Sequence, residues 1–323
     1  MSRPALSAAD ETVEARPTPD AAAVVPGRGG LTERAGSKTP ARVITVQNGR
    51  RTARTDVLAT EEPLEIRLLA GSERRTVAIT MRTPGADFEL AAGFLFGEGV
   101  IAGPETIRAI AYCVDRDVAE EQRYNIVTVR LRTRTLPELA TLERHFLTSS
   151  ACGVCGKASL ESLHARGCTP VPPSVATVSP AVLTGLTDTL RQAQGLFQAT
   201  GGLHAAGLFD LDGRLLALRE DVGRHNALDK LIGWAVLQGR VPLRDQIVLV
   251  SGRSSFELAQ KCAVAGVQIL CSVSAPSSLA VSLAERFGLT LIGFLRGDRF
   301  NVYAGAERLA YPDEHGVEPS TES

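Results

Sequence analysis

The first half of the chain alternates apolar and polar positions in several short runs. Leu64–Leu68 and Thr76–Thr80 alternate on either side of a turn at Gly71-Ser72, which is typical of a β-hairpin with one buried face. The same pattern predicts three more strands, at Val43–Val46, Ile107–Val114 and Tyr124–Leu131.

Two helices accompany these strands in the prediction. Phe88–Phe96 is strongly apolar and follows Asp87, which suits an N-cap, while Leu136–Phe146 forms the second helical run. For the charged residues beside the first helix, among them Arg82 and Glu98, we expect only capping and contact with solvent. Residues 41–147 therefore predict a small α+β domain.

The second half alternates strands with helices. A helix at Ala181–Gln194 precedes two strands, Leu203–Phe209 and Arg214–Leu218, that flank the turn residues Asp212-Gly213. An apolar helix at Leu228–Leu237 follows. Strands are then predicted at Gln246–Val250, Val267–Val273 and Leu289–Leu295, with helices at Phe256–Ala265 and up to Phe287 between them, and an edge strand at Phe300–Tyr303. This alternation is typical of the α/β class.

Composition limits the functional classes. The chain has 323 residues, 44% of them hydrophobic, which is enough for two domains. Residues 1–40 lack periodicity and are expected to be disordered, and residues 314–323 form a tail. A net charge of −1 and 5% aromatic residues argue against nucleic-acid binding and electrostatic membrane attachment. We find neither a signal-peptide pattern nor an apolar run long enough to span a bilayer, so we expect a cytoplasmic protein.

Residues 148–157 contain the most distinctive chemistry, a Cys-x-x-Cys pair. Glycine follows both Cys152 and Cys155, and Lys157 stands just downstream. Glycines favour a mobile loop, and a nearby cation favours the nucleophilic thiolate. Redox or sulfur chemistry is one interpretation of the pair. A zinc site, with His164 and Cys168 as further ligands, is the second. The third is that the spacing of the two cysteines has no function.

Polar loops follow the three strands predicted after residue 245. They are Ser251-Gly252-Arg253-Ser254-Ser255, Ser274-Ala275-Pro276-Ser277-Ser278 and Arg296-Gly297-Asp298-Arg299. In a parallel sheet these carboxyl ends share one edge, where hydroxyls, helix N-termini and arginines would form a pocket for phosphate. The alternative is that these serines only cap the helices that follow, including a capping box formed by Ser254 and Glu257.

A charged junction lies beside this edge, at residues 219–230. It places ionisable residues and amides, among them Asp221 and His225, where a strand meets a helix. Strand-to-helix junctions often hold binding residues, so we predict a functional site here, against the alternative of a salt-bridged helix start.

From about residue 55 to residue 310 the chain resembles a known family, the formate dehydrogenase accessory sulfurtransferases (FdhD/NarQ). The motifs that carry the resemblance are Met81-Arg82-Thr83-Pro84-Gly85, Glu89–Leu95, Cys152–Lys157, Gly201-Gly202-Leu203-His204, Glu220–Asn226, Ser251-Gly252-Arg253, Ser274-Ala275-Pro276 and Gly293–Gly297.

The resemblance implies a sulfurtransferase that acts as a sulfur carrier. Such proteins accept persulfide sulfur from a cysteine desulfurase, on the position of Cys152, and deliver it to the molybdenum bis(molybdopterin guanine dinucleotide) cofactor for formate dehydrogenase. It also implies homodimers and a cytidine-deaminase-like three-layer domain, here residues 158–313. The cofactor-binding segment would be Phe294, Leu295, Arg296, Gly297, Asp298 and Arg299, and we add Ser251, Gly252, Arg253, Ser274, His225 and Asp221.

Cys155 is expected to assist Cys152, either by attacking the persulfide to release the sulfur or by protecting it. Two rivals remain. Zinc deamination is disfavoured because it needs His-x-Glu, which the chain lacks. A zinc-stabilised chaperone would carry the cofactor without sulfur chemistry. For the sulfur carrier, which we favour, we predict no metal site.

Overall fold

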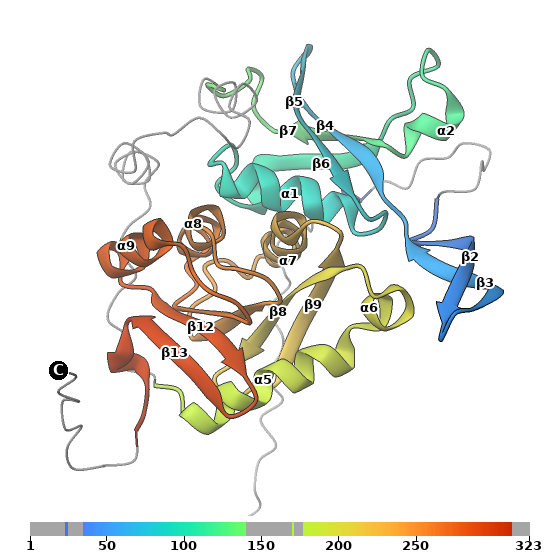
Figure 1. Ribbon diagram of the computed structural model, residues 1–323. Helices are drawn as coiled ribbons and strands as arrows, with labels where there is room; N and C mark the ends of the chain where they lie inside the picture. The colour runs from blue at the N-terminus through green and yellow to red at the C-terminus, as the bar shows by residue number, and fades with distance from the viewer. Residues whose placement is uncertain (1–22, 25–34, 140–169, 171–176, 312–323) are drawn as a thin grey trace, which may run out of the picture.

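The computed structural model describes residues 23–24, 35–139, 170 and 177–311. Within these residues the chain forms a five-stranded sheet, a six-stranded sheet and a separate two-stranded sheet, with helices between and around them (Figure 1). The mixed α/β class predicted from the sequence is confirmed at this level.

The five-stranded sheet has the order β1-β6-β7-β4-β5. Its hairpin of β4 and the edge strand β5 matches the predicted alternation, and the alternating apolar positions of β4 from Leu64 to Ala70 are buried. Its strands are β1 (Ala23–Val24), β4 (Glu62–Ala70), β5 (Glu73–Arg82), β6 (Ile107–Tyr112) and β7 (Ile126–Leu131). Helix α1 (Asp87–Gly97) packs against it, and short helices η1 (Pro104–Thr106) and α2 (Glu120–Arg123) lie in its connections.

The six-stranded sheet has the order β13-β12-β11-β10-β8-β9. Strands β10, β11 and β12 are parallel, whereas β8, β9 and β13 run antiparallel to their neighbours. The strands are β8 (His204–Asp210), β9 (Leu215–Asp221), β10 (Gln246–Val250), β11 (Ile269–Ser272), β12 (Thr290–Arg296) and β13 (Arg299–Ala304). As predicted, β13 is an edge strand.

Helices cover both faces of the six-stranded sheet, which gives three layers. The side chains of β8 alternate between them: Phe209 joins the core formed with α5 (Pro180–Ala193), and Leu208 joins the core on the other face. That other face carries α7 (Arg224–Leu237), α8 (Phe256–Val264) and α9 (Ser278–Phe287); α6 (Gly195–Thr200) follows α5, and η2 (Ala306–Arg308) follows β13.

The two large sheets share one hydrophobic core, because helix α1 crosses α7 in direct contact (Figure 1). The contact is made by glycine on both helices. A Cβ at Gly93 would overlap the backbone oxygen of Asp229, and one at Gly233 would overlap that of Glu89. The predicted domains therefore meet across a packed interior.

Several predicted boundaries change. Helix α7 begins at Arg224, one turn before the predicted Leu228, and Leu136–Leu139 are not helical. The capping assignments are wrong: α8 has Ser255 as its N-cap and α1 has Ala86, and neither N-cap side chain makes a capping hydrogen bond. Asp87 is instead buried and pairs with the equally buried Arg82, at 3.1 Å between Oδ1 and Nε.

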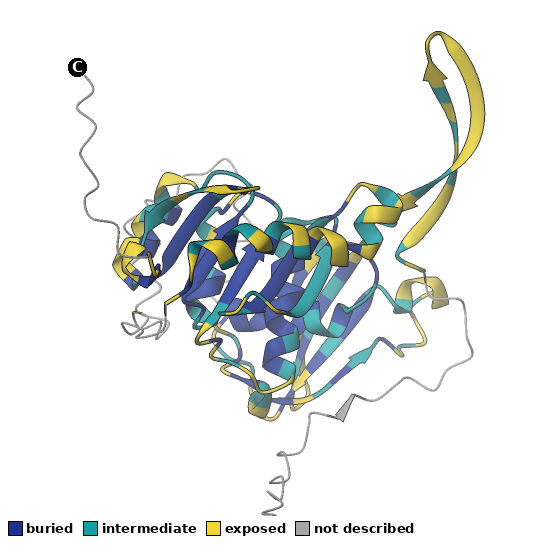
Figure 2. Cartoon of the chain, turned by 90° about the horizontal axis from the view of Figure 1, so that it is seen from below, coloured by how far each residue is buried: buried dark blue, intermediate teal, exposed yellow. Residues whose placement is uncertain are grey.

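An arm projects from this body (Figure 2). Strands β2 (Lys38–Gln47) and β3 (Arg50–Ala59) pair over ten residues each, which extends the predicted Val43–Val46 strand in both directions. Asn48 and Gly49 join them with φ of 53° and 76°, the left-handed values that a tight two-residue hairpin turn requires.

Most of the segments expected to be disordered lie outside the described residues. The described part of residues 1–40 departs from the expectation: Ala23–Val24 pair with β6, and β2 begins at Lys38. Among the helices that the structure describes, none is long and apolar enough to cross a membrane.

Candidate active site

The carboxyl ends of β10, β11 and β12 lie at one edge of the six-stranded sheet, as the parallel pairing requires. Strand β8 runs the opposite way, so its first residue, His204, reaches the same edge. The backbone N–H of Ser251, which follows β10, donates to the oxygen of Ala205 at 3.0 Å. Four strands therefore bring polar groups together at this edge.

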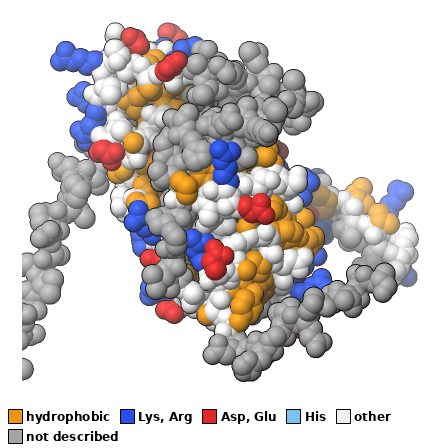
Figure 3. Space-filling model, turned by 90° about the vertical axis from the view of Figure 1, so that its left-hand side faces the viewer, with side chains coloured by type: hydrophobic (Ala, Val, Ile, Leu, Met, Phe, Trp, Pro, Cys, Tyr) orange, Lys and Arg blue, Asp and Glu red, His pale blue; other side chains and the backbone are white. Residues whose placement is uncertain are grey.

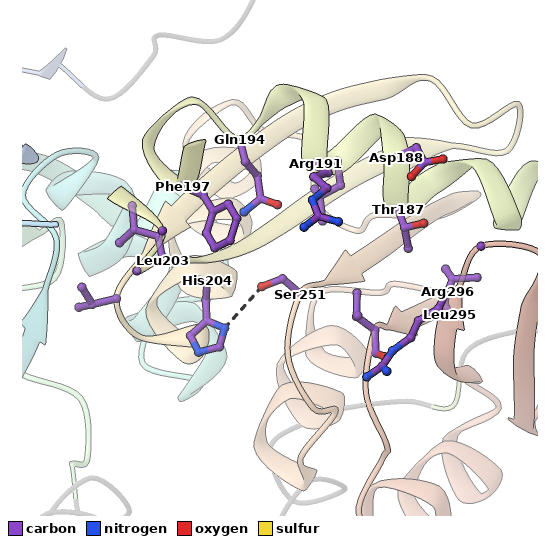
Figure 4. Close-up of a pocket in the computed structure, with 16 residues that line it drawn as sticks. Thr187, Asp188, Arg191, Gln194, Phe197, Leu203, His204, Ser251, Leu295 and Arg296 are labelled. Carbon is purple, nitrogen blue, oxygen red and sulfur yellow. Dashed lines mark hydrogen bonds between the residues drawn. The ribbon is translucent and has the colours of Figure 1, made fainter. Parts of the chain in front are cut away.

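A cavity of about 690 Å³ opens at this edge. The strand ends form one side of the cavity. Helices α5 and α6, with the turn that follows them, form the opposite side (Figure 4). The lining residues are Thr187, Asp188, Leu190, Arg191, Gln194, Phe197, Gly201, Gly202, Leu203, His204, Val222, Ser251, Val273, Leu295, Arg296 and Gly297. The size and the mixture of apolar and polar groups are typical of a small-molecule site.

Two guanidinium groups lie on opposite sides of this cavity. Arg191 comes from α5, and Arg296 comes from the end of β12 (Figure 4). The Nε of Arg296 donates to the oxygen of Val273 at 3.0 Å, which orients the side chain at the strand edge. Asp188 supplies a carboxylate and Phe197 an aromatic ring. The cavity thus offers two cations for an anionic ligand and a ring for an apolar or aromatic part.

His204 and Ser251 form a pair inside the cavity (Figure 4). The backbone N–H of Ala205 donates to Ser251 Oγ at 2.9 Å, and the same hydroxyl lies 3.4 Å from His204 Nδ1. Burial, followed by the positive charges of Arg224 and His225, lowers the pKa of His204 against the opposing charge of Asp221. The geometry therefore favours a neutral imidazole beside the Ser251 hydroxyl.

This geometry can be compared with known proteins. A model of the FdhD/NarQ family matches residues 59–310. The chain belongs to the FdhD/NarQ family. The match covers β4 to β13 and every residue that lines the cavity, and it leaves almost all of the arm outside.

Relatives of this family member carry one name. It is 52% identical over 268 residues to the sulfur carrier protein FdhD of Nocardia farcinica, covering 83% of this chain and 93% of that protein. It is 51% identical over 273 residues to the protein of the same name from Streptomyces coelicolor, covering 83% and 94%. The Mycobacterium tuberculosis protein is 50% identical over 259 residues, covering 79% and 92%.

A solved structure supports the fold of this family member. A protein from Desulfotalea psychrophila, designated a formate dehydrogenase accessory protein, superposes with a TM-score of 0.64. The two chains are 28% identical, and the match covers 84% of this chain and 99% of that one.

The predicted cofactor residues divide into two groups. Ser251, Leu295, Arg296 and Gly297 line the cavity. The others lie beside it or apart from it: Gly252, Arg253, Ser274, Phe294, Asp298, Arg299, His225 and Asp221. Of the three arginines expected to converge, only Arg296 lines the cavity, and Arg253 and Arg299 are exposed away from its lining.

Phe294 and Ser274 shape the strand ends. Phe294 has a φ of 52°, and its N–H donates to the oxygen of Ser274 at 3.2 Å. The pairing of β12 with β13 shifts register between Gly293 and Arg296. Because a register shift re-aims the side chains that follow it, this irregularity places Leu295 and Arg296 at the cavity.

The charged junction at 219–230 holds the molecule together. Asp221 is fully buried and accepts hydrogen bonds from Thr83 N at 3.1 Å and Gly223 N at 2.8 Å, and it pairs with Lys230 at 2.6 Å. Lys230 also donates to Thr83 O at 2.8 Å, and Asn226 donates to Met81 O at 2.7 Å. These contacts match the alternative of a salt-bridged helix start, extended to a partner strand.

His225, a residue of the junction, contacts the start of α8. Its Nε2 is 2.9 Å from Glu257 Oε2 and 3.3 Å from Ser255 Oγ. The hydrogen bond from His225 lowers the pKa of Glu257 more than burial raises it. Glu257 was expected in a capping box with Ser254, but Ser254 Oγ is buried and has no hydrogen-bond partner within the described part of the chain.

Sequence reasoning missed the wall of the cavity. Thr187, Asp188 and Arg191 come from α5, Phe197 comes from α6, and Gln194 lies between the two helices. The three from α5 lie on an amphipathic helix, whose polar positions have the same spacing as a solvated face. The Gly201–His204 motif was the one available signal, and all four of its residues line the cavity.

The predicted catalytic pair, Cys152 and Cys155, lies outside the described residues, as do the alternative zinc ligands His164 and Cys168. Three other cysteines are described, and all are buried. Burial raises the pKa of the Cys262 and Cys271 thiols far above the ordinary range, so neither is a nucleophile at neutral pH. Over the described ranges, no group of three or more His, Cys, Asp or Glu residues is arranged to hold a metal ion.

Proposed function

We propose that this protein is a sulfur carrier for the maturation of formate dehydrogenase. The names of its relatives and of the solved neighbour support this coarse statement. In finer terms, the protein accepts persulfide sulfur from a cysteine desulfurase and delivers it to the molybdenum bis(molybdopterin guanine dinucleotide) cofactor. It works in the cytoplasm as a homodimer, and its larger region is a cytidine-deaminase-like domain.

The observation that carries the ligand proposal is the cavity with Arg191 and Arg296 on opposite walls. The cofactor, which is the substrate here, contains pyrophosphate groups and guanine rings. Guanidinium groups bind phosphate oxygens in a bidentate manner, and an aromatic ring such as Phe197 stacks on a base. The donor set present in the cavity therefore fits one guanine nucleotide arm of the cofactor.

The sulfur steps belong to the two loop cysteines. The Cys152 thiolate attacks the outer sulfur of the desulfurase persulfide; the sulfur–sulfur bond breaks, and the desulfurase leaves as a thiolate. Cys152 then carries the persulfide to the cavity. Cys155 either attacks the Cys152 sulfur, which forms a disulfide and releases hydrosulfide, or protects the persulfide until delivery.

Intact-protein mass spectrometry tests the carrier step. The protein is incubated with a cysteine desulfurase and cysteine, as wild type, Cys152→Ala, Cys155→Ala and, as a control outside the loop, Cys113→Ala. We expect one added sulfur on every form except Cys152→Ala. Loss only in Cys155→Ala would keep the function and reverse the two roles. A wild type without added sulfur but with tightly bound zinc would replace this function with the zinc-stabilised chaperone.

A further inference from the structure

The arm, defined as β2, β3 and their turn (residues 38–59), differs from the rest of the molecule. It belongs to neither large sheet and projects away from the body (Figures 1 and 2). A two-stranded hairpin is only marginally stable alone in water. The tight Asn48-Gly49 turn and ten uninterrupted pairs define its shape, and the two faces of the ribbon differ sharply.

One face of the arm contains an ion pair, although Leu58 on it is 46% exposed and Arg50 on it makes no ion pair with a described residue. Arg54 Nη2 lies 3.1 Å from Asp56 Oδ2, and Arg54 Nε donates to Thr45 Oγ1 at 2.8 Å. In an antiparallel ladder, directly paired residues share a face and alternate along each strand. Val43, which pairs with Arg54, is on this face and is half-buried. Arg50, which pairs with Gln47 beside the turn, is also on it.

The opposite face, which we call the open face, combines apolar residues with unpaired cations. Ile44 and Val46 are 68% and 63% exposed on this face, although both side chains are large and apolar. Lys38, Arg42 and Arg51 make no ion pair with any residue that the structure describes. The complete open face, read from the pairing, is Lys38, Pro40, Arg42, Ile44, Val46, Arg51, Ala53, Thr55, Val57 and Ala59. It contains no carboxylate.

Such a face is complementary to an apolar protein surface with an acidic rim. Exposed apolar residues on a ribbon mark an interaction site, and cations at the edge steer and orient an acidic partner. Elsewhere the surface differs, because acidic and basic side chains are interspersed on the side shown in Figure 3. Single-stranded nucleic acid is disfavoured because the open face has no aromatic ring on which a base could stack.

The base of the arm adjoins the cavity. Strand β3 packs against α6, which supplies Phe197 to the cavity wall. A Cβ at Gly202, another lining residue, would lie 4.0 Å from the Cβ of Ala59. A protein held on the open face would therefore stand beside the cavity and what it binds.

We propose that the open face docks the protein that receives the loaded cofactor, formate dehydrogenase, through an apolar patch of that enzyme edged with carboxylates. This inference rests on the proposed function. The position beside the cavity favours the receiving protein over the desulfurase, which needs only the cysteine loop. The arm holds the acceptor at the mouth of the cavity while the cofactor passes across.

Adjacent arginines on opposite faces provide the test. Binding of immobilised cofactor-free formate dehydrogenase to the full-length protein is measured for wild type, Arg51→Glu, Arg42→Glu/Arg51→Glu and Ile44→Ser/Val46→Ser, with Arg50→Glu as the control of equal charge. We expect a loss of about tenfold or more for the double variants, together with a weaker salt dependence for the charge reversal, and little change for Arg50→Glu. Circular dichroism checks that each variant is folded.

Sulfur loading by the desulfurase is measured on the same variants and should stay at the wild-type level. Dehydrogenase binding that is absent in wild type, or unchanged in both double variants, would overturn the proposal. Lost loading with intact dehydrogenase binding would also overturn it, because the arm would then serve the donor. Arm-dependent binding by a protein that never acquires sulfur would instead refute the proposed function and leave the docking face standing.

Discussion

The charged junction at 219–230 and the strand-end cavity look alike in sequence and differ in structure. Both place arginines, carboxylates and glycine where a strand ends. In the junction, Asp221 and Lys230 are buried and bind each other and Thr83, which follows strand β5 of the other sheet. In the cavity, Arg191 and Arg296 face an open hollow. The difference lies in whether a distant segment covers the charges, and local sequence does not contain that information.

The largest effect should come from the junction. Lys230→Met leaves Asp221 buried without its cation, and breaking a buried pair in this way costs about 3–5 kcal/mol. Urea unfolding should show that loss in the free energy of unfolding. Lys38→Met removes an exposed lysine from the arm and should change stability by less than about 0.5 kcal/mol. Equal effects of the two variants would mean that the junction does not join the two sheets.

The cavity should show the opposite behaviour, a loss of binding without a loss of stability. Arg191→Ala and Arg296→Ala each remove a charged donor, worth about 1.5–3 kcal/mol of binding. With GDP as the probe, calorimetry should show an affinity about 10- to 100-fold weaker, at an unchanged urea midpoint. Arg253→Ala is the matched control because Arg253 is exposed and does not line the cavity. A similar loss in that control would place the nucleotide elsewhere.

The smallest effect concerns pH. Because the folded pKa of His204 is lowered, the unfolded chain takes up a proton first as pH falls below the ordinary histidine value of about 6.5. Its contribution to stability is therefore present above that value and decreases as the solution becomes more acidic. Urea unfolding of wild type and His204→Gln should show the wild type losing more stability on acidification. A His204 pKa at or above the ordinary value, measured by NMR, would contradict this environment.

Periodicity predicted most of the six-stranded sheet. Gln246–Val250 is a strand with the predicted bounds, and the three parallel strands bring Ser251 and Arg296 to one edge as expected. These strands are predictable because a strand that is buried on both faces of a sheet has a continuous run of apolar residues. The α5 wall was not predictable as a binding surface, because Asp188 and Arg191 have the spacing of an ordinary solvated helix face.

The errors have a common physical cause. Asp87 was expected at an N-cap and instead pairs with the buried Arg82. Asp221, predicted to bind the cofactor, is buried beside Lys230, and its role as a ligand stays a prediction. An acidic residue beside a helix start satisfies several local rules at once, and the choice among them depends on packing across the two sheets. Arg82, expected at the surface, is almost fully buried for the same reason.

The glycine crossing of α1 and α7 has a consequence for synthesis. Helix α1 ends at Gly97, but the partner that covers it is complete only at Leu237. At roughly 5–20 residues per second, a ribosome leaves the apolar side of α1 without its partner for on the order of ten seconds. During that interval the nascent amino-terminal half is a natural client for chaperones. A chain that stalls before α7 exposes the apolar side of α1, which can aggregate with other chains.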